Sequence, residues 1–189
     1  MRYVYLVIVI LSLSACNNSP PIKSYEIPEH EKIADRITAR TVQKIEAETG
    51  LRLMGIGGGM MNQVRMMAIS FEQLGEITME QGRELVIYCM NEYLSAINGS
   101  EEIRPFLVHY PFITKDIQID IYIRKQDRRE VSIGTLCVVG AIKGKLQYDI
   151  KQPGLPSLRQ VHEETYDEAV KILETAGPLQ KIRKNTYHM

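Results

Sequence analysis

The chain has 189 residues, of which 44% are hydrophobic and 24% are charged, and this is enough apolar content for one globular domain with its own core. Its 23 basic and 23 acidic side chains balance, so no net field favours nucleic acid or a polyanionic substrate. The composition therefore predicts a single domain that has no nucleic-acid partner.

The N-terminus predicts an exported protein. A short cationic start, Met1-Arg2, precedes the uncharged apolar run Tyr3–Leu13. This run is shorter than the about 20 residues that a membrane-spanning helix needs. Its length and its cationic flank are typical of the apolar region of a signal peptide.

The residues Leu13-Ser14-Ala15-Cys16 resemble the lipobox of bacterial lipoproteins, which is an aliphatic residue, two small residues and a cysteine. The resemblance implies a signal peptide over residues 1–15 and lipidation of Cys16, whose thiol receives a diacylglyceryl group and whose new amino terminus is usually acylated. Two or more acyl chains give a stable anchor, whereas one chain gives marginal binding. From the residues alone, an ordinary secretory leader and an uncleaved N-terminal anchor are the alternatives.

The resemblance also implies a location. Asn17 follows Cys16, at a position where lipoproteins kept in the inner membrane often carry Asp. We therefore expect the periplasmic face of the outer membrane if the host has two membranes, and otherwise the outer face of the cytoplasmic membrane. The resemblance ends at Cys16 and implies nothing about the domain that follows.

Residues 16–28 predict an extended tether, because this segment is rich in proline and poor in apolar side chains. A single domain is expected over residues 29–177, with a polar C-terminal tail over residues 178–189. Its first helix is predicted over 29–49, where apolar side chains recur with helical spacing and Gly50 follows as a C-terminal cap.

The stretch "LMGIGGGMMN", residues 53–62, raises the question of a phosphate site. It has neither the third glycine of a dinucleotide-binding fingerprint nor the Gly-Lys-Ser/Thr of a phosphate loop. We expect a hairpin of strands 51–56 and 64–71, in which the glycines form a flexible or bulged turn and supply positive φ angles. As a surface loop, the turn is also a candidate contact for a partner, through Gly57, Gly58, Gly59, Met60 and Met61.

The rest of the chain predicts two helices and several strands. A capping box at Thr78 starts a helix that ends near Gly99, and a second box at Thr165 starts a helix that ends before Gly177. Alternation of isoleucines predicts an antiparallel-type strand from Ile117. Further strands are expected over residues 106–110, 131–139 and 145–150, while 157–164 is left open between a strand and the first turns of the last helix. The order predicts an α+β domain, with an antiparallel sheet of about five or six strands and three helices packed to one side or end.

The residues able to carry chemistry do not form a motif. His30, His109, His162 and His188 are scattered singly, and no metal site or cofactor is predicted. Cys89 and Cys137 fall on predicted core faces, which favours two buried free thiols, and a disulfide between them is the alternative in an exported protein. Seven of the nine methionines lie between residues 54 and 90, which favours core filling over metal binding, with Met60 and Met61 as an exposed pair.

Three functional hypotheses follow. The first is a non-enzymatic envelope lipoprotein whose domain binds or scaffolds another envelope component. The second is an envelope hydrolase whose residues, such as His109 or His162 with acidic neighbours, meet only in the folded chain. The third is an accessory subunit that recruits its partner by pairing on a sheet edge near the glycine stretch.

Overall fold

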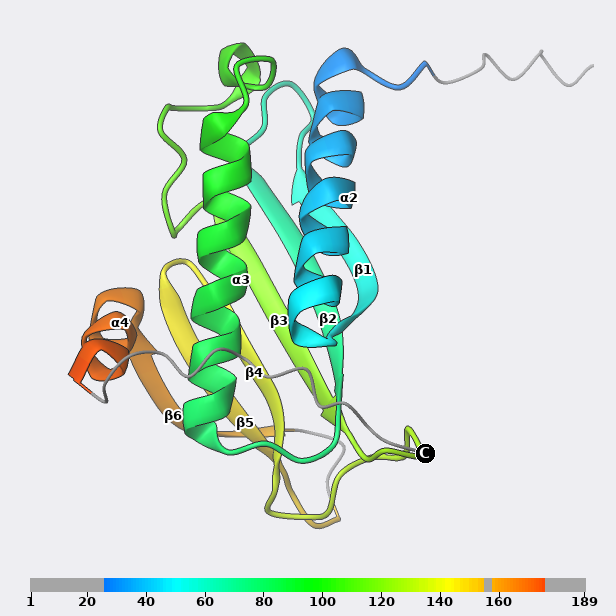
Figure 1. Cartoon of the computed structure of the whole chain (residues 1–189), viewed down its shortest axis with the longest axis vertical. Helices are drawn as coiled ribbons and strands as arrows, with labels where there is room; N and C mark the ends of the chain where they lie inside the picture. The colour runs from blue at the N-terminus through cyan, green and yellow to red at the C-terminus, as the bar shows by residue number, and fades with distance from the viewer. Residues whose placement is uncertain (1–25, 155–157, 176–189) are drawn as a thin grey trace, which may run out of the picture.

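The computed structural model describes residues 26–154 and 158–175 of the chain. Its strands form one sheet with the order β1-β2-β3-β4-β5-β6. Helices α2 and α3 cover one face of this sheet, and α4 packs against α3 at the β6 end (Figure 1). The predicted α+β class is confirmed. In chain order the elements are α2 (Glu29–Thr49), β1 (Arg52–Gly59), β2 (Met66–Leu74), α3 (Met79–Gly99), the 3-10 helix η1 (Arg104–Phe106), β3 (Ile117–Arg124), β4 (Leu136–Ile142), β5 (Lys145–Lys151), β6 (Leu158–Thr165) and α4 (Tyr166–Thr175).

The helix boundaries follow from local capping. Gly50 has a φ of 80° and ends α2, with its N–H bonded to the carbonyl oxygen of Glu46. Thr78 and Gln81 form the predicted capping box at the start of α3. Thr165 and Glu168 hydrogen-bond in the same way at the start of α4. The predicted starts of all three helices are therefore confirmed.

The sheet is antiparallel except for one pair. Strands β2 and β3 run parallel, and α3 is the crossover between them. The predicted antiparallel sheet is confirmed as mostly antiparallel, and this pair departs from the prediction because alternation in β3 reports only that one face is covered. The alternate residues of β3, such as Asp120 and Tyr122, lie on a face that no described helix covers.

The core lies between the covered face of the sheet and helices α2 and α3. It includes Phe71, Tyr93 and Tyr148, all fully buried. Met67 and Met90 are also fully buried, which agrees with core filling, whereas Met61 is 88% exposed. No helix among the described residues has the length and apolar character needed to cross a membrane.

Three strand predictions change in the structure. Residues 106–110 are not a strand, because Pro105 in η1 has no N–H and only an isolated bridge joins Leu107 to Val64. The strand expected from residue 131 starts at Leu136, since Gly134 has a left-handed φ of 82° and turns the chain first. Of the segment left open over 157–164, the described residues from Leu158 onward belong to strand β6.

Candidate functional site

Strand β1 forms an edge of the sheet, and its backbone is lightly covered. It pairs with β2, and no other strand of the described chain lies along its second side. The N–H of Leu53 is already bonded to Oε1 of Glu46 at 2.8 Å. The next six residues, Met54–Gly59, carry no charge, and Met54 and Ile56 are 48% and 55% exposed. We call Met54–Gly59 the bare strand. Because an edge strand pairs only half of its backbone groups, the bare strand offers N–H and C=O groups to a second chain.

Three of its four glycines have no packing reason among the residues that the structure describes. A Cβ added at Gly55 would meet nothing within 4 Å, and at Gly57 or Gly59 the nearest atoms are 3.9 and 4.0 Å away. Only at Gly58 would a Cβ lie too close to backbone, 2.8 Å from the carbonyl oxygen of Met66. Glycine inside a strand costs about 0.5–1 kcal/mol relative to alanine, and it often marks the close approach of another backbone.

The prediction that these glycines form the turn is therefore wrong. They lie inside β1, and none of them has a left-handed φ. The pairing of Gly57 with Ala68, and of Ile56 with the buried Ile69, assigns the two faces of β1. The three unexplained glycines lie on the open face of the sheet, while Ile56 faces α2.

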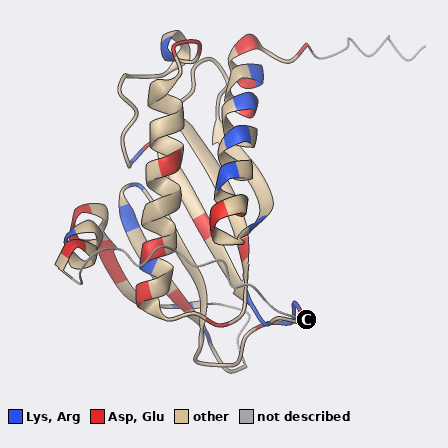
Figure 2. Ribbon diagram, viewed as in Figure 1, with Lys and Arg blue, Asp and Glu red and all other residues tan. Residues whose placement is uncertain are grey.

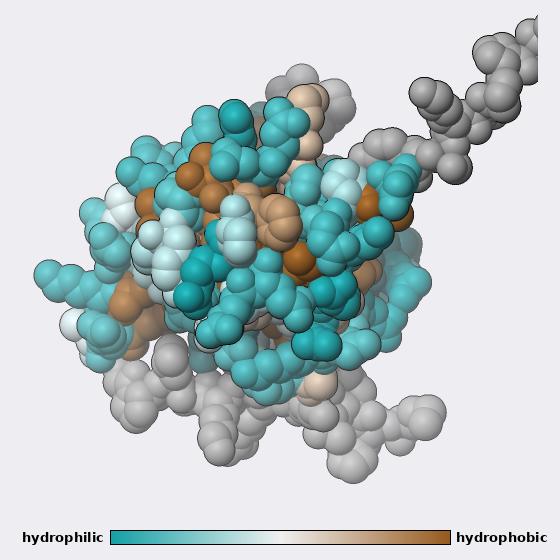
Figure 3. Space-filling view, turned by 90° about the horizontal axis from the view of Figure 1, so that it is seen from above, coloured by the Kyte–Doolittle hydropathy of each residue, from teal (hydrophilic) through white to brown (hydrophobic). Residues whose placement is uncertain are grey.

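The turn that follows the bare strand, residues 60–65, is fixed by hydrogen bonds from two directions. Nε2 of the buried His30 on α2 donates to the carbonyl oxygen of Met60 at 2.6 Å. The N–H of Val64 donates to the carbonyl oxygen of Phe106 at 2.8 Å. The predicted partner contact, Gly57–Met61, is thus divided in the structure. Its three glycines belong to the bare strand, and its two methionines belong to the hydrogen-bonded turn. Seen from the end of the molecule where this turn lies, hydrophobic side chains interrupt an otherwise hydrophilic surface (Figure 3).

A groove runs between the N-terminal half of α2 and the bare strand, with a volume of about 300 Å³. We call it the α2–β1 groove. It is lined by Glu31, Asp35 and Thr38 of α2 and by Ile56, Gly57, Gly58, Met60 and Met61 of the hairpin. Its walls thus combine two carboxylates with apolar side chains. The sequence did not single out Glu31 and Asp35, although their spacing of four residues places them on one flank of a helix.

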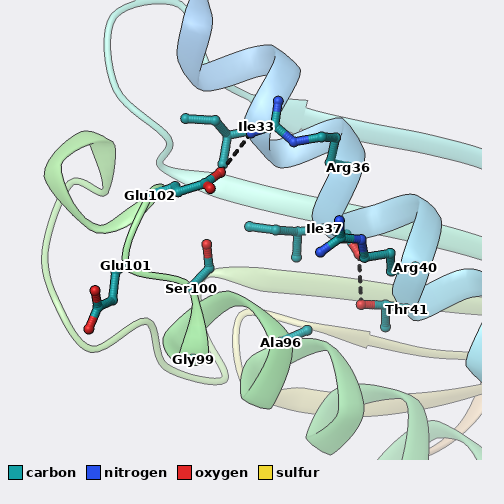
Figure 4. Close-up of a pocket in the computed structure, with 10 residues that line it drawn as sticks. All are labelled: Ile33, Arg36, Ile37, Arg40, Thr41, Ala96, Gly99, Ser100, Glu101 and Glu102. Atoms are coloured by element: carbon teal, nitrogen blue, oxygen red, sulfur yellow. Dashed lines mark hydrogen bonds and ion pairs between the residues drawn. The ribbon is translucent and has the colours of Figure 1, made fainter.

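A second groove, of about 490 Å³, lies on the other flank of α2, between α2 and the end of α3 (Figure 4). Arg36 and Arg40 of α2 line it above an apolar floor that includes Ile37. One nitrogen of Arg36 lies 2.7 Å from Oε2 of Glu102, so this cation is already paired. Basic residues recur along α2 in Figure 2. Among the groove-lining residues, α2 therefore carries acids toward β1 and bases toward α3.

The opposite edge of the sheet, β6, differs from β1 in its charges. Arg159 and Glu163 are exposed on it, and Oε1 of Glu163 lies 2.6 Å from Nζ of Lys145. Charged side chains on an edge strand oppose pairing with another chain. Of the two edges, β1 is therefore the one suited to accept a strand.

The histidines offered for a hydrolase do not come together. Nε2 of His109 lies 2.8 Å from Oδ2 of Asp116, in a segment that is hydrogen-bonded to the C-terminal end of α3. Nε2 of His162 lies 3.5 Å from Oε2 of Glu164, which is paired with the N-terminal part of α3. Since α3 has 21 residues and is about 30 Å long, the two pairs lie near opposite ends of the molecule.

A buried charged cluster joins α3 to β5 and β6. Nε of Arg83 lies 2.7 Å from Oε1 of Glu164, and the hydroxyl of Tyr148 donates to the same oxygen. Burial alone would raise the pKa of Glu164, but the hydrogen bonds from Arg83 and Tyr148 outweigh it, and the pKa is lowered. At Tyr148, by contrast, burial dominates and raises the pKa. The members of the cluster bind one another, which gives them a structural role.

The two cysteines of the described chain are free thiols, so the alternative of a disulfide is not realised in this structure. Cys89 is fully buried in α3, and burial raises the pKa of its thiol. Cys137 on β4 is partly buried, which also raises its thiol pKa, and its Sγ donates to the carbonyl oxygen of Asp149. Neither thiol has the lowered pKa of a nucleophile.

The signal peptide, the lipobox with Cys16, most of the tether, His188 and the C-terminal tail lie outside the described residues. Within residues 26–154 and 158–175, no three histidine, cysteine or acidic side chains gather closely enough to hold a metal ion. No family model matches the sequence, and no curated protein and no solved structure is significantly similar to the chain.

Proposed function

We propose that this protein is a lipid-anchored lipoprotein of the bacterial envelope whose domain binds another envelope component without catalysing a reaction. The lipobox at Leu13-Ser14-Ala15-Cys16 supports the anchor and the location. The tether over residues 16–28 leaves the domain free to reach a partner away from the membrane surface.

One observation carries the binding role: over Met54–Gly59 the edge strand β1 is uncharged and partly exposed, and no described strand pairs with its outer side. An exposed edge strand of this kind is a template for pairing with another chain. Natural proteins usually block such strands with charged residues, proline or a covering segment. A bulge at Met54 is present in β1, but the glycines after it continue in register with β2. The partner is therefore expected to bind as an extended segment along β1, with main-chain hydrogen bonds supplying affinity.

The test is site-specific photocrosslinking of the full chain in its native membrane. A photoreactive residue at Met61, beside the bare strand, should give an adduct with another envelope protein. The same residue at Val161, which is 41% exposed on β6, is the matched control. Equal adducts at both positions, or none at Met61, would contradict the proposal.

The anchor has its own test. Mass spectrometry of the protein extracted from its membrane should find an acylated Cys16 as the first residue. The variant Cys16→Ala should carry no lipid. An unmodified chain that begins at Met1 would refute the proposed envelope location. The proposed pairing of a partner along the edge of β1 would be unaffected.

A further inference from the structure

The α2–β1 groove opens beside the bare strand, so a segment bound along β1 must pass it. We infer that this segment carries a lysine or arginine that enters the groove and pairs with Asp35. The inference rests on the proposed function, and it names the chemistry of the partner: an extended segment with a cation on the side that faces α2.

Charge complementarity supports this assignment. Asp35 is exposed and forms no hydrogen bond or ion pair with another described residue, and Glu31 lies one turn before it on the same wall. Among the described residues, no basic side chain lines the groove. Arg36 and Arg40 line the second groove, on the opposite flank of α2. A cation that enters from β1 therefore meets the carboxylate of Asp35, for which no described groove-lining base competes.

The apolar walls suit a long cationic side chain. Met60 and Met61 are flexible and polarisable, and such side chains adapt to the aliphatic stem of a lysine or arginine. Ile56 faces the same side of β1 and is 55% exposed. Because side chains of a strand alternate, a bound segment reaches this side with every second residue. We therefore expect an apolar residue two positions from the cation, in contact with Ile56.

A second copy of this chain does not fit the groove. The one charged residue of β1 is Arg52, which pairs with Glu72 and lies on the face of the sheet away from α2. In an antiparallel pairing about a two-fold axis perpendicular to the sheet, the α2 helices of both copies lie on the same face, so Arg52 of a second copy would also point away from Asp35. Two copies paired by their β1 strands would supply no cation to either groove.

The experiment measures binding of short synthetic peptides to the full chain. The peptides alternate valine and threonine and carry lysine, norleucine or glutamate at one position facing α2. Lysine should bind about fivefold more tightly than norleucine, as expected of an exposed ion pair, and glutamate more weakly. In Asp35→Asn the preference for lysine should disappear, and in Asp35→Lys it should reverse. Glu174→Gln, an equal charge change at an exposed position of α4, should leave the preference unchanged.

Three results would overturn the inference, and they separate it from the proposed function. If all three peptides bind equally and Ile56→Lys in β1 abolishes their binding, edge pairing stands and the inferred cation is refuted. Binding of no peptide at any charge, with no effect of β1 substitutions on partner crosslinking, would refute both. A dimer in sedimentation that Ile56→Lys disrupts would show that the occupant is a second copy.

Discussion

Two glycines of β1 accept a side chain without steric conflict, so replacing them should stabilise the isolated protein. The change is Gly55→Val together with Gly57→Val. An added Cβ meets nothing within 4 Å at Gly55 and only the Cβ of Ala68, at 3.9 Å, at Gly57. Neither glycine has a left-handed φ that valine would resist. Valine favours the extended backbone that both residues already adopt.

The expected gain follows from the cost of glycine in a strand. Each replacement should recover about 0.5–1 kcal/mol, and the pair about 1–2 kcal/mol if the two sites are nearly additive. For a chain of this size, 1 kcal/mol corresponds to about 2–4 °C in melting temperature, so the double variant should melt about 2–8 °C higher. Gly58→Val is the control, because its Cβ would lie 2.8 Å from the carbonyl oxygen of Met66, and it should lower the melting temperature.

The assay is thermal unfolding of the full chain, followed by circular dichroism, together with partner crosslinking from Met61. We expect the double variant to be more stable and yet to crosslink less, since valines at residues 55 and 57 would stand on the open face beside the side chains of a segment paired along the edge of β1. A lower melting temperature would refute the steric reasoning. Higher stability with crosslinking at the wild-type level would show that the glycines are not kept for a partner.

Three further predictions concern the scaffold of the site. Arg83→Met leaves the buried carboxylate of Glu164 without its cation and should cost about 3–5 kcal/mol of unfolding free energy at neutral pH. In the wild type the lowered pKa of Glu164 stabilises the fold fully above its unfolded pKa, and that contribution is lost as pH falls through the folded pKa. The deficit should therefore shrink at about pH 4, and urea unfolding that gives an equal deficit at both pH values would contradict this. His30→Ala removes the hydrogen bond to the carbonyl oxygen of Met60 and should cost about 1–3 kcal/mol of unfolding free energy. Amide exchange in the turn over residues 60–65 should become faster, and unchanged exchange would show that His30 does not hold this turn. The Cys89 thiol should resist iodoacetamide until the chain unfolds, because it is buried and its pKa is raised, and rapid alkylation of the native protein would contradict its placement.

The helices were predictable because their signals are local. Capping boxes at Thr78 and Thr165 and the glycine at residue 50 act within one turn of the chain, and each lies where the sequence placed it. The isoleucine alternation of β3 was equally local and correctly marked its buried face. The parallel partner of β3 was not predictable in this way, since one open face is compatible with either direction of pairing.

The site itself was only partly visible in the sequence. The residues Gly57–Met61 were singled out, but the glycines were expected to turn the chain, and the structure has them in β1. Glycine permits both roles, and the choice depends on the register with β2. His30 and Asp35 lie more than 20 positions before the residues that they meet, so only the packing of α2 beside β1 brings them to the strand.

The central claim is that the backbone of the bare strand pairs with a partner in the envelope. The most direct measurement is hydrogen exchange of the β1 amides, compared between protein in its native membrane and protein purified away from partners. We predict that the outward-pointing amides of Met54–Gly59, those not bonded to β2, are protected in the membrane and lose that protection on purification, while the amides of β6 exchange alike in both states. Equal exchange of the β1 amides in both states would contradict the claim.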